Sequence, residues 1–79
     1  MQVEVTYYAM LRERRGLSVE TIQTEAAGLG ALYDDLAGKY GLPTERHHLK
    51  VAVNDQFASW ENSFASGDRI AFIPPVSGG

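Results

Sequence analysis

The residues with the clearest chemical potential are the last ones of the 79-residue sequence, which ends in Phe-Ile-Pro-Pro-Val-Ser-Gly-Gly. Pro74 and Pro75 lack the backbone N–H that strand pairing requires, so we expect a strand to end there and the chain to leave the sheet. The four residues that follow, extended at about 3.3 Å each, span roughly 13 Å. Glycine has no Cβ, so Gly78 can pass through a channel too narrow for side chains. The pattern predicts a slender projecting tail, residues 74–79.

The reactive group expected on this tail is the unhindered α-carboxylate of Gly79. A carboxylate is a poor electrophile, so a partner enzyme would use ATP to convert it to an acyl-adenylate, from which sulfide or another nucleophile displaces AMP. The sequence contains no cysteine, which excludes a thiol nucleophile, a disulfide and a zinc-thiolate site. We therefore expect no catalytic side chain and no bound cofactor, with ATP used by the activating enzyme. A frayed or inert tail remains the alternative.

Composition and charge exclude several classes of function. The formal net charge of −3 argues against nucleic-acid binding, which needs a basic face. The small basic cluster of Arg12, Arg14 and Arg15 is expected to face solvent or a partner protein. No apolar stretch reaches the roughly 18 residues of a membrane helix, and the alternating N-terminus is unlike a secretion signal, so we expect a cytoplasmic protein without membrane attachment.

Three further groups of side chains are candidates for binding roles. His47 and His48 are adjacent, and neighbouring side chains do not easily converge on one ion, so no metal site is predicted. Trp60 is expected to cover an edge of the core, with an interface role as the alternative. Tyr8 and Met10 are expected on the sheet face opposite Val3 and Val5, where they would support strand pairing or contact a partner.

The hydrophobic pattern predicts one domain, residues 1–79, of the α+β class. Alternation of polar and apolar residues predicts strands over 2–8, 17–24, 49–53 and 69–73 and a short strand near 56–60, with 2–24 forming a hairpin around a charged turn. Apolar residues at helical spacing predict one main helix over 29–40 that ends at Gly41 and packs on one face of a mixed sheet of four or five strands. This order resembles that of the ubiquitin-like β-grasp architecture, and the resemblance implies that the first and last strands are parallel neighbours at the centre.

Three segments carry a resemblance that covers essentially the whole chain: YYAMLRERRG near the start, VAVN in the third strand and GDRIAFIPPVSGG at the end. They resemble the small subunit of molybdopterin synthase, a sulfur carrier. The resemblance implies a heterotetramer in which a large subunit is the catalytic partner and the small subunit donates sulfur to cyclic pyranopterin monophosphate, for molybdenum cofactor biosynthesis. It also implies a second partner, a ubiquitin-activating-like adenylyltransferase that prepares the terminal thiocarboxylate.

Carried over to matching positions, the resemblance assigns a role to nine residues. Gly79 would bear the adenylate and then the thiocarboxylate. The partner-binding residues would be Gly78 in the channel, the stalk before it, an apolar pair and one arginine of the first loop: Ser77, Val76, Pro75, Pro74, Ile73, Phe72 and Arg12. Three alternatives stay open: a sulfur carrier for thiamine or amino-acid biosynthesis, a ubiquitin-like modifier conjugated to lysines, and a binding module with an inert tail.

Overall fold

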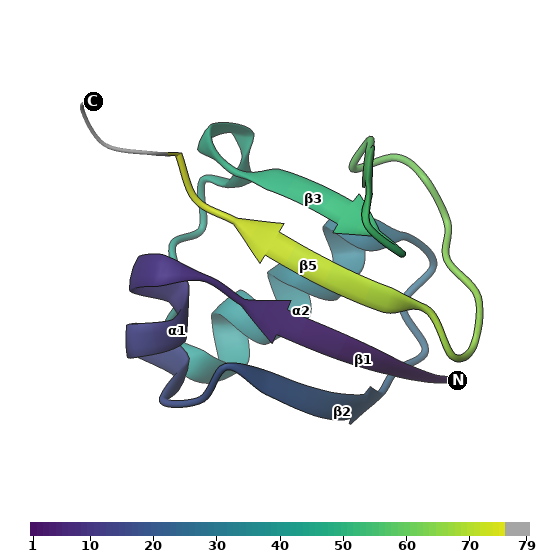
Figure 1. Cartoon of the computed structure of the whole chain (residues 1–79), viewed down its shortest axis with the longest axis horizontal. Helices are drawn as coiled ribbons and strands as arrows, with labels where there is room; N and C mark the ends of the chain where they lie inside the picture. Colours follow the sequence, from purple (N-terminus) through teal and green to yellow (C-terminus); the bar gives the residue numbers. More distant parts are fainter. Residues whose placement is uncertain (76–79) are drawn as a thin grey trace.

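The computed structural model describes residues 1–75, and Figure 1 shows them as a mixed sheet with helices packed against it. Within this range the chain forms five strands, two α-helices and one short 3₁₀ helix. In chain order these are β1 (Gln2–Tyr7), α1 (Ala9–Arg15), β2 (Val19–Gln23), α2 (Leu29–Tyr40), η1 (Arg46–His48), β3 (Lys50–Val53), β4 (Gln56–Ala58) and β5 (Arg69–Ile73).

The sheet has the strand order β2-β1-β5-β3-β4, with β1 and β5 at its centre. These two strands are parallel, and Tyr7 at the end of β1 lies opposite Phe72 near the end of β5. The remaining pairs are antiparallel. This arrangement confirms the expected β-grasp order. Because β1 and β5 run in the same direction, the segment that follows β1 lies beside the segment that follows β5.

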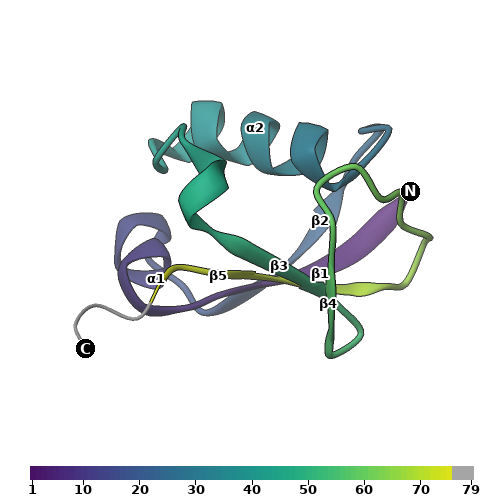
Figure 2. The same cartoon turned by 90° about the horizontal axis from the view of Figure 1, so that it is seen from above.

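The core lies between the sheet and α2, which crosses one face of the sheet while no helix of residues 1–75 crosses the other (Figure 2). Most side chains of the core come from the strands, where every second residue points inward, and from the apolar stripe of α2, as the spacing of these residues predicts. The fully buried members are Val3, Val5, Tyr7, Leu11, Leu29, Leu32, Tyr33, Val51, Ile70 and Phe72. Trp60 is partly buried against this core and stacks on Phe72 at 5.9 Å between ring centroids, which confirms its expected position.

The segment between β1 and β2 differs from the prediction of a charged turn, because residues 9–15 form the helix α1. The two strands do pair antiparallel, with Val3 opposite Ile22, but they are joined through this helix and do not form a simple hairpin. A seven-residue helix has too few turns to show a periodic apolar stripe, and here Leu11 is its one buried residue. Gly16 ends α1 in the left-handed conformation, with φ 87°.

The predicted end of α2 at Gly41 is confirmed, and β3 also ends in a turn. Gly41 ends α2 in the left-handed conformation, and its N–H donates to the carbonyl of Ala37. Asn54 and Asp55 both have positive φ, at 50° and 71°, and form the tight turn between β3 and β4. In residues 1–75 the helices are too short and too polar to cross a membrane.

Candidate functional site

The candidate site is the point where the chain leaves the centre of the sheet. Ile73 is the last residue of β5, and the prolines end the strand as their missing N–H groups predict. Pro74 is buried at the end of the sheet, whereas Pro75 is exposed. The other expected members of the tail, Val76, Ser77, Gly78 and Gly79, lie outside the described residues. Their assigned roles therefore stay predictions.

Phe72 and Ile73, the apolar pair before the prolines, lie on opposite faces of the sheet. Phe72 is fully buried and contacts the ring of Tyr33 edge-on, at 5.0 Å between centroids. Its side chain is therefore part of the core and is not available for the partner contact that the resemblance assigned to it. Ile73 is half-buried and borders a small hollow with Tyr8 and Phe57 on the face that α2 does not cover. Of the pair, only Ile73 presents side-chain surface to a partner.

An apolar groove of about 590 Å³ runs beside the foot of the tail. It lies between the start of α1 and the end of β5, because the parallel pairing of β1 and β5 brings these two segments together. Its lining residues are Tyr8, Ala9, Met10, Arg12, Ile73, Pro74 and Pro75. The structure thus brings Arg12 to the prolines, 62 positions later in the chain, from a helix and not from the expected loop.

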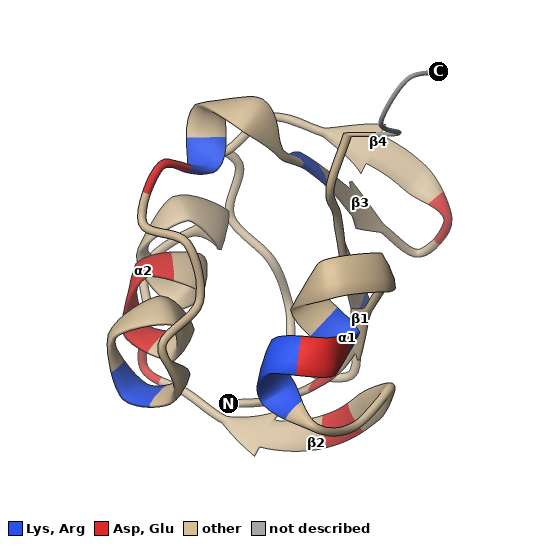
Figure 3. Cartoon of the chain, turned by 90° about the vertical axis from the view of Figure 1, so that its left-hand side faces the viewer, with Lys and Arg blue, Asp and Glu red and all other residues tan. Residues whose placement is uncertain are grey.

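Arg12 is the arginine of α1 whose side chain has no hydrogen bond or ion pair among residues 1–75, and Figure 3 shows the charged residues of this helix. Arg14 donates to the backbone carbonyl of Gly41 at 3.0 Å. Arg15 binds Glu20 through two hydrogen bonds, at 2.8 and 2.7 Å. Two arginines therefore attach α1 to the domain, while the Arg12 side chain remains exposed at the groove.

A half-buried hydrogen-bond network holds α1 in place. Glu20 on β2 accepts both bonds from Arg15 and a third from the Tyr7 hydroxyl at 2.7 Å. The Arg15 guanidinium also lies over the ring of Tyr40, 3.7 Å from its centroid. The hydrogen bond from Arg15 holds the pKa of Glu20 below its ordinary value. Burial, together with the bond to Glu20, raises the pKa of Tyr7 well above its ordinary value, so this hydroxyl stays protonated.

The uncovered sheet face carries the exposed aromatic residues beside the groove. Tyr8 is 46% exposed and Phe57 on β4 is 75% exposed, and a hollow of about 180 Å³ lies between them. The expectation that Tyr8 lies opposite the core face is confirmed. Met10 is also exposed, but it belongs to α1 and not to the strand on which it was expected.

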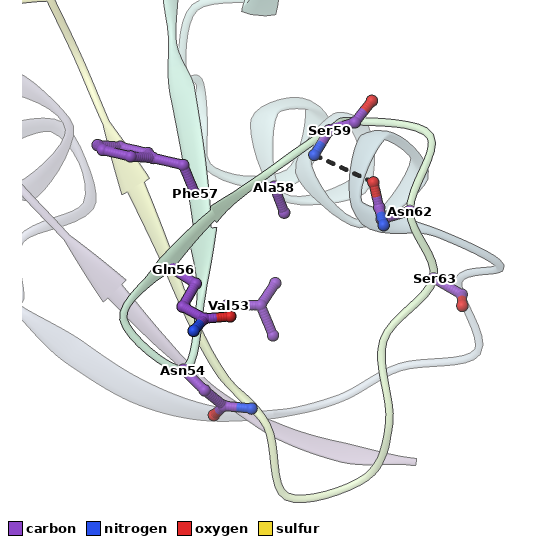
Figure 4. Close-up of a pocket in the computed structure, with 8 residues that line it drawn as sticks. All are labelled: Val53, Asn54, Gln56, Phe57, Ala58, Ser59, Asn62 and Ser63. Atoms are coloured by element: carbon purple, nitrogen blue, oxygen red, sulfur yellow. Dashed lines mark hydrogen bonds between the residues drawn. The ribbon is translucent and has the colours of Figure 1, made fainter.

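A hollow of about 720 Å³ lies beside β4 and the loop that follows it and is shown in Figure 4. Its lining residues, Val53, Asn54, Gln56, Phe57, Ala58, Ser59, Asn62 and Ser63, include no ionisable side chain. Asn62 accepts a hydrogen bond from the backbone N–H of Ser59 at 3.1 Å, which closes the loop on itself. Acid-base chemistry is therefore not expected in this hollow.

A second groove, of about 290 Å³, lies on the other side of the two prolines. Glu45 and His48 border it together with Leu49, Pro43 and Met10. The segment between α2 and β3 contains the 3₁₀ helix η1, which places these side chains at the foot of the tail. Sequence spacing could not show this, because the two segments meet only through the pairing of β3 with β5.

Comparison with known proteins places this geometry in a family. The profile of the ThiS family matches residues 5–79. A Haemophilus influenzae protein named "Molybdopterin synthase sulfur carrier subunit" is 34% identical over 80 residues, which cover 98% of this chain and 99% of that protein. A human protein of the same name is 34% identical over 84 residues, which cover 99% of this chain and 94% of that protein.

Solved structures agree in fold. The crystal structure of SAMP1 from Haloferax volcanii superposes with a TM-score of 0.83 and 28% identity, covering all of both chains. A chain from the Helicobacter pylori complex of subunits 1 and 2 of molybdopterin-converting factor superposes with a TM-score of 0.68 and 29% identity, again covering both chains fully. With a family profile over residues 5–79 and relatives above 30% identity along almost the whole sequence, this chain belongs to the ThiS family.

Proposed function

We propose that this chain is the sulfur-carrier subunit of a molybdopterin synthase. The observation that carries the proposal is the central strand β5, which ends at Ile73 and is followed by Pro74 and Pro75 between the Arg12 groove and an uncovered apolar face. Full-length relatives named as sulfur-carrier subunits of this enzyme support it. The proposed partner is a large subunit, by analogy with the Helicobacter pylori complex of two subunits.

The proposed chemistry takes place on the Gly79 carboxylate and not on a side chain. An adenylyltransferase joins the carboxylate to the AMP part of ATP and releases pyrophosphate, and a sulfide equivalent then displaces AMP to leave a thiocarboxylate. Transfer of that sulfur to the pterin precursor returns the carboxylate, with water supplying the oxygen. The chain is thus a stoichiometric sulfur donor that binds neither ATP nor an organic cofactor, and the large subunit supplies the acid-base groups.

Mass spectrometry tests the proposal directly. Protein co-expressed with a competent activating enzyme is expected to gain about 16 Da, because sulfur replaces one carboxylate oxygen. Deletion of Gly79 is expected to abolish both the gain and sulfur transfer, and because the core lies within residues 3–72 the fold should not change. An unchanged mass in the presence of the active activating enzyme would reject the carrier role.

A second candidate function is a modifier conjugated to lysine side chains, which the resemblance to SAMP1, the small archaeal modifier protein of Haloferax volcanii, favours. The same acyl-adenylate would then react with an amine and not with sulfide. Isopeptide-linked adducts ending in Gly79, found in cell extracts by tryptic mass spectrometry, would identify this role. Stable association with a large subunit and no such adducts would favour the sulfur carrier.

A further inference from the structure

The segment between α2 and β3 brings three metal-ligating side chains together. Glu45, His47 and His48 are all exposed, and one ligand atom from each lies within 4.8 Å of the others. The rings of the two histidines are 4.0 Å apart between centroids. The argument that adjacent histidines diverge does not hold here. Neighbours in a strand point to opposite faces, whereas neighbours in the 3₁₀ helix η1 are only about a third of a turn apart.

The backbone that carries these ligands is anchored by the residue between them. Arg46 turns away from the three ligands and donates to Asp34 of α2, at 3.2 and 3.5 Å. Its guanidinium lies so close to Gly30 that a Cβ there would approach it to 2.9 Å. The Leu49 N–H donates to the Arg46 carbonyl at 2.9 Å, and the Leu49 side chain is buried. Ligands on an anchored segment bind with less loss of conformational entropy.

Two imidazoles and one carboxylate are the ligand types that suit zinc and its neighbours among the divalent transition metals, whereas magnesium and calcium prefer oxygen ligands alone. Three protein ligands leave a fourth tetrahedral position for water or for a group of a bound partner. His47 and His48 are also the only histidines of the sequence, which has no cysteine to compete for such an ion.

We propose that Glu45, His47 and His48 form a binding site for one divalent transition-metal ion of the zinc type. Glu45 and His48 also border the 290 Å³ groove formed with Pro74 and Pro75, so the ion would lie at the foot of the tail. The site goes beyond the proposed sulfur-carrier role and does not depend on it, because its three ligands lie outside the tail.

The test is a titration of the untagged full chain with Zn²⁺, followed by NMR of the histidine side chains. Because there are two histidines, their imidazole signals report on this site alone. Both are expected to shift with one common saturation curve at one ion per chain, and calorimetry should give the same stoichiometry. Signals that stay unsaturated at millimolar Zn²⁺, or a shift in only one histidine, would overturn the site.

Three single variants locate the ligands: His47→Ala, His48→Ala and Glu45→Gln. Each is expected to weaken Zn²⁺ binding at least tenfold without changing the circular dichroism spectrum, because all three side chains are exposed. The matched control is Glu4→Gln, since Glu4 is exposed and pairs with Arg69 at the opposite end of β5 from the prolines. Equal affinities in Glu45→Gln and the wild type would reject the three-ligand site.

Discussion

At the scale of single residues, Ala9 has the backbone conformation that matters most for the groove. It has φ 50°, in the left-handed region that residues with a Cβ rarely adopt. This conformation turns the chain from β1 into α1 and thereby places Arg12 beside Pro74 and Pro75. The turn that forms the groove therefore contains local strain, which the rest of the fold must offset.

Replacing Ala9 by glycine is expected to remove this strain. Ala9→Gly should raise the free energy of unfolding by roughly 0.5 to 1 kcal/mol, because glycine adopts positive φ without a steric cost. Ala31→Gly is the matched control, since Ala31 is an exposed residue of α2 without positive φ, and there glycine should cost roughly 1 kcal/mol. Urea unfolding of both variants measures the difference. A loss of stability in Ala9→Gly would contradict the assigned strain.

Glu20 is expected to make the stability of the domain sensitive to acid. Since Arg15 lowers the pKa of Glu20 in the folded state, its contribution is complete above the ordinary value of 4.5 and is lost as the pH falls through the lower, folded-state pKa. Glu20→Gln should therefore be less stable than the wild type at neutral pH, and the difference should shrink below about pH 4. Thermal unfolding across this range checks the prediction.

Glu13→Gln provides the control for the acid experiment. Glu13 is exposed on α1, the helix that carries Arg15, and its side chain has no hydrogen bond or ion pair among residues 1–75. This variant is expected to follow the wild-type pH dependence within experimental error. A Glu20→Gln variant that also follows the wild type at every pH would show that the network does not contribute to stability.

At the scale of elements, β5 has two separate roles. Its inward residues Ile70 and Phe72 are fully buried between the sheet and α2, while Ala71 and Ile73 face the uncovered side. Phe72 also contacts the rings of Tyr7 and Trp60, at 6.3 and 5.9 Å between centroids. The strand that positions the tail is thus also the centre of the core.

Truncating this inward side chain is expected to cost most of the stability of the domain. Phe72→Ala should lower the free energy of unfolding by about 3 to 5 kcal/mol, since it removes a fully buried ring and leaves a cavity. Phe57→Ala is the control, because Phe57 is 75% exposed and its loss should cost less than about 0.5 kcal/mol. Chemical denaturation of both proteins gives the two values. Similar losses in the two variants would contradict the burial difference.

At the scale of the whole molecule, α2 covers one face of the sheet, and no helix of residues 1–75 crosses the other face. The uncovered face carries Tyr8, Phe57 and Ile73 next to the groove that contains Arg12. Exposed aromatic residues that are grouped in this way are typical of protein interfaces. The proposed partner contact therefore extends from the foot of the tail across this face.

Charging this face is expected to weaken the complex with the large subunit. Tyr8→Glu should raise the dissociation constant at least tenfold without changing the thermal midpoint, because Tyr8 is 46% exposed and makes no core contact. Val19→Glu is the matched control, since Val19 is 51% exposed on the edge strand β2, two strands away from β5. Calorimetry with the purified large subunit measures both. Equal weakening by the two variants would show that the effect is not specific to the part of this face beside β5.

Local pattern was sufficient for most of the elements. Alternation predicted β1, β3 and β5, helical spacing predicted α2, and Gly41 predicted where α2 ends, because each signal depends on neighbouring residues. The helix α1 was predicted as a turn, since its single buried residue, Leu11, gives no periodic pattern. The resemblance assigned Phe72 to a partner contact, whereas its burial in the core depends on which face of the sheet α2 covers, and strand alternation alone does not say this.

The class of the fold, the end of the last strand at the prolines and the glycine-rich tail could all be predicted from local sequence, because they follow from the chemistry of adjacent residues. The side chains that surround the foot of the tail could not be predicted in this way. Arg12 reaches Pro74 through the parallel pairing of β1 with β5, and Glu45 and His48 reach it through the pairing of β3 with β5. Such contacts depend on long-range strand pairing and on buried surface, which no short segment of sequence encodes.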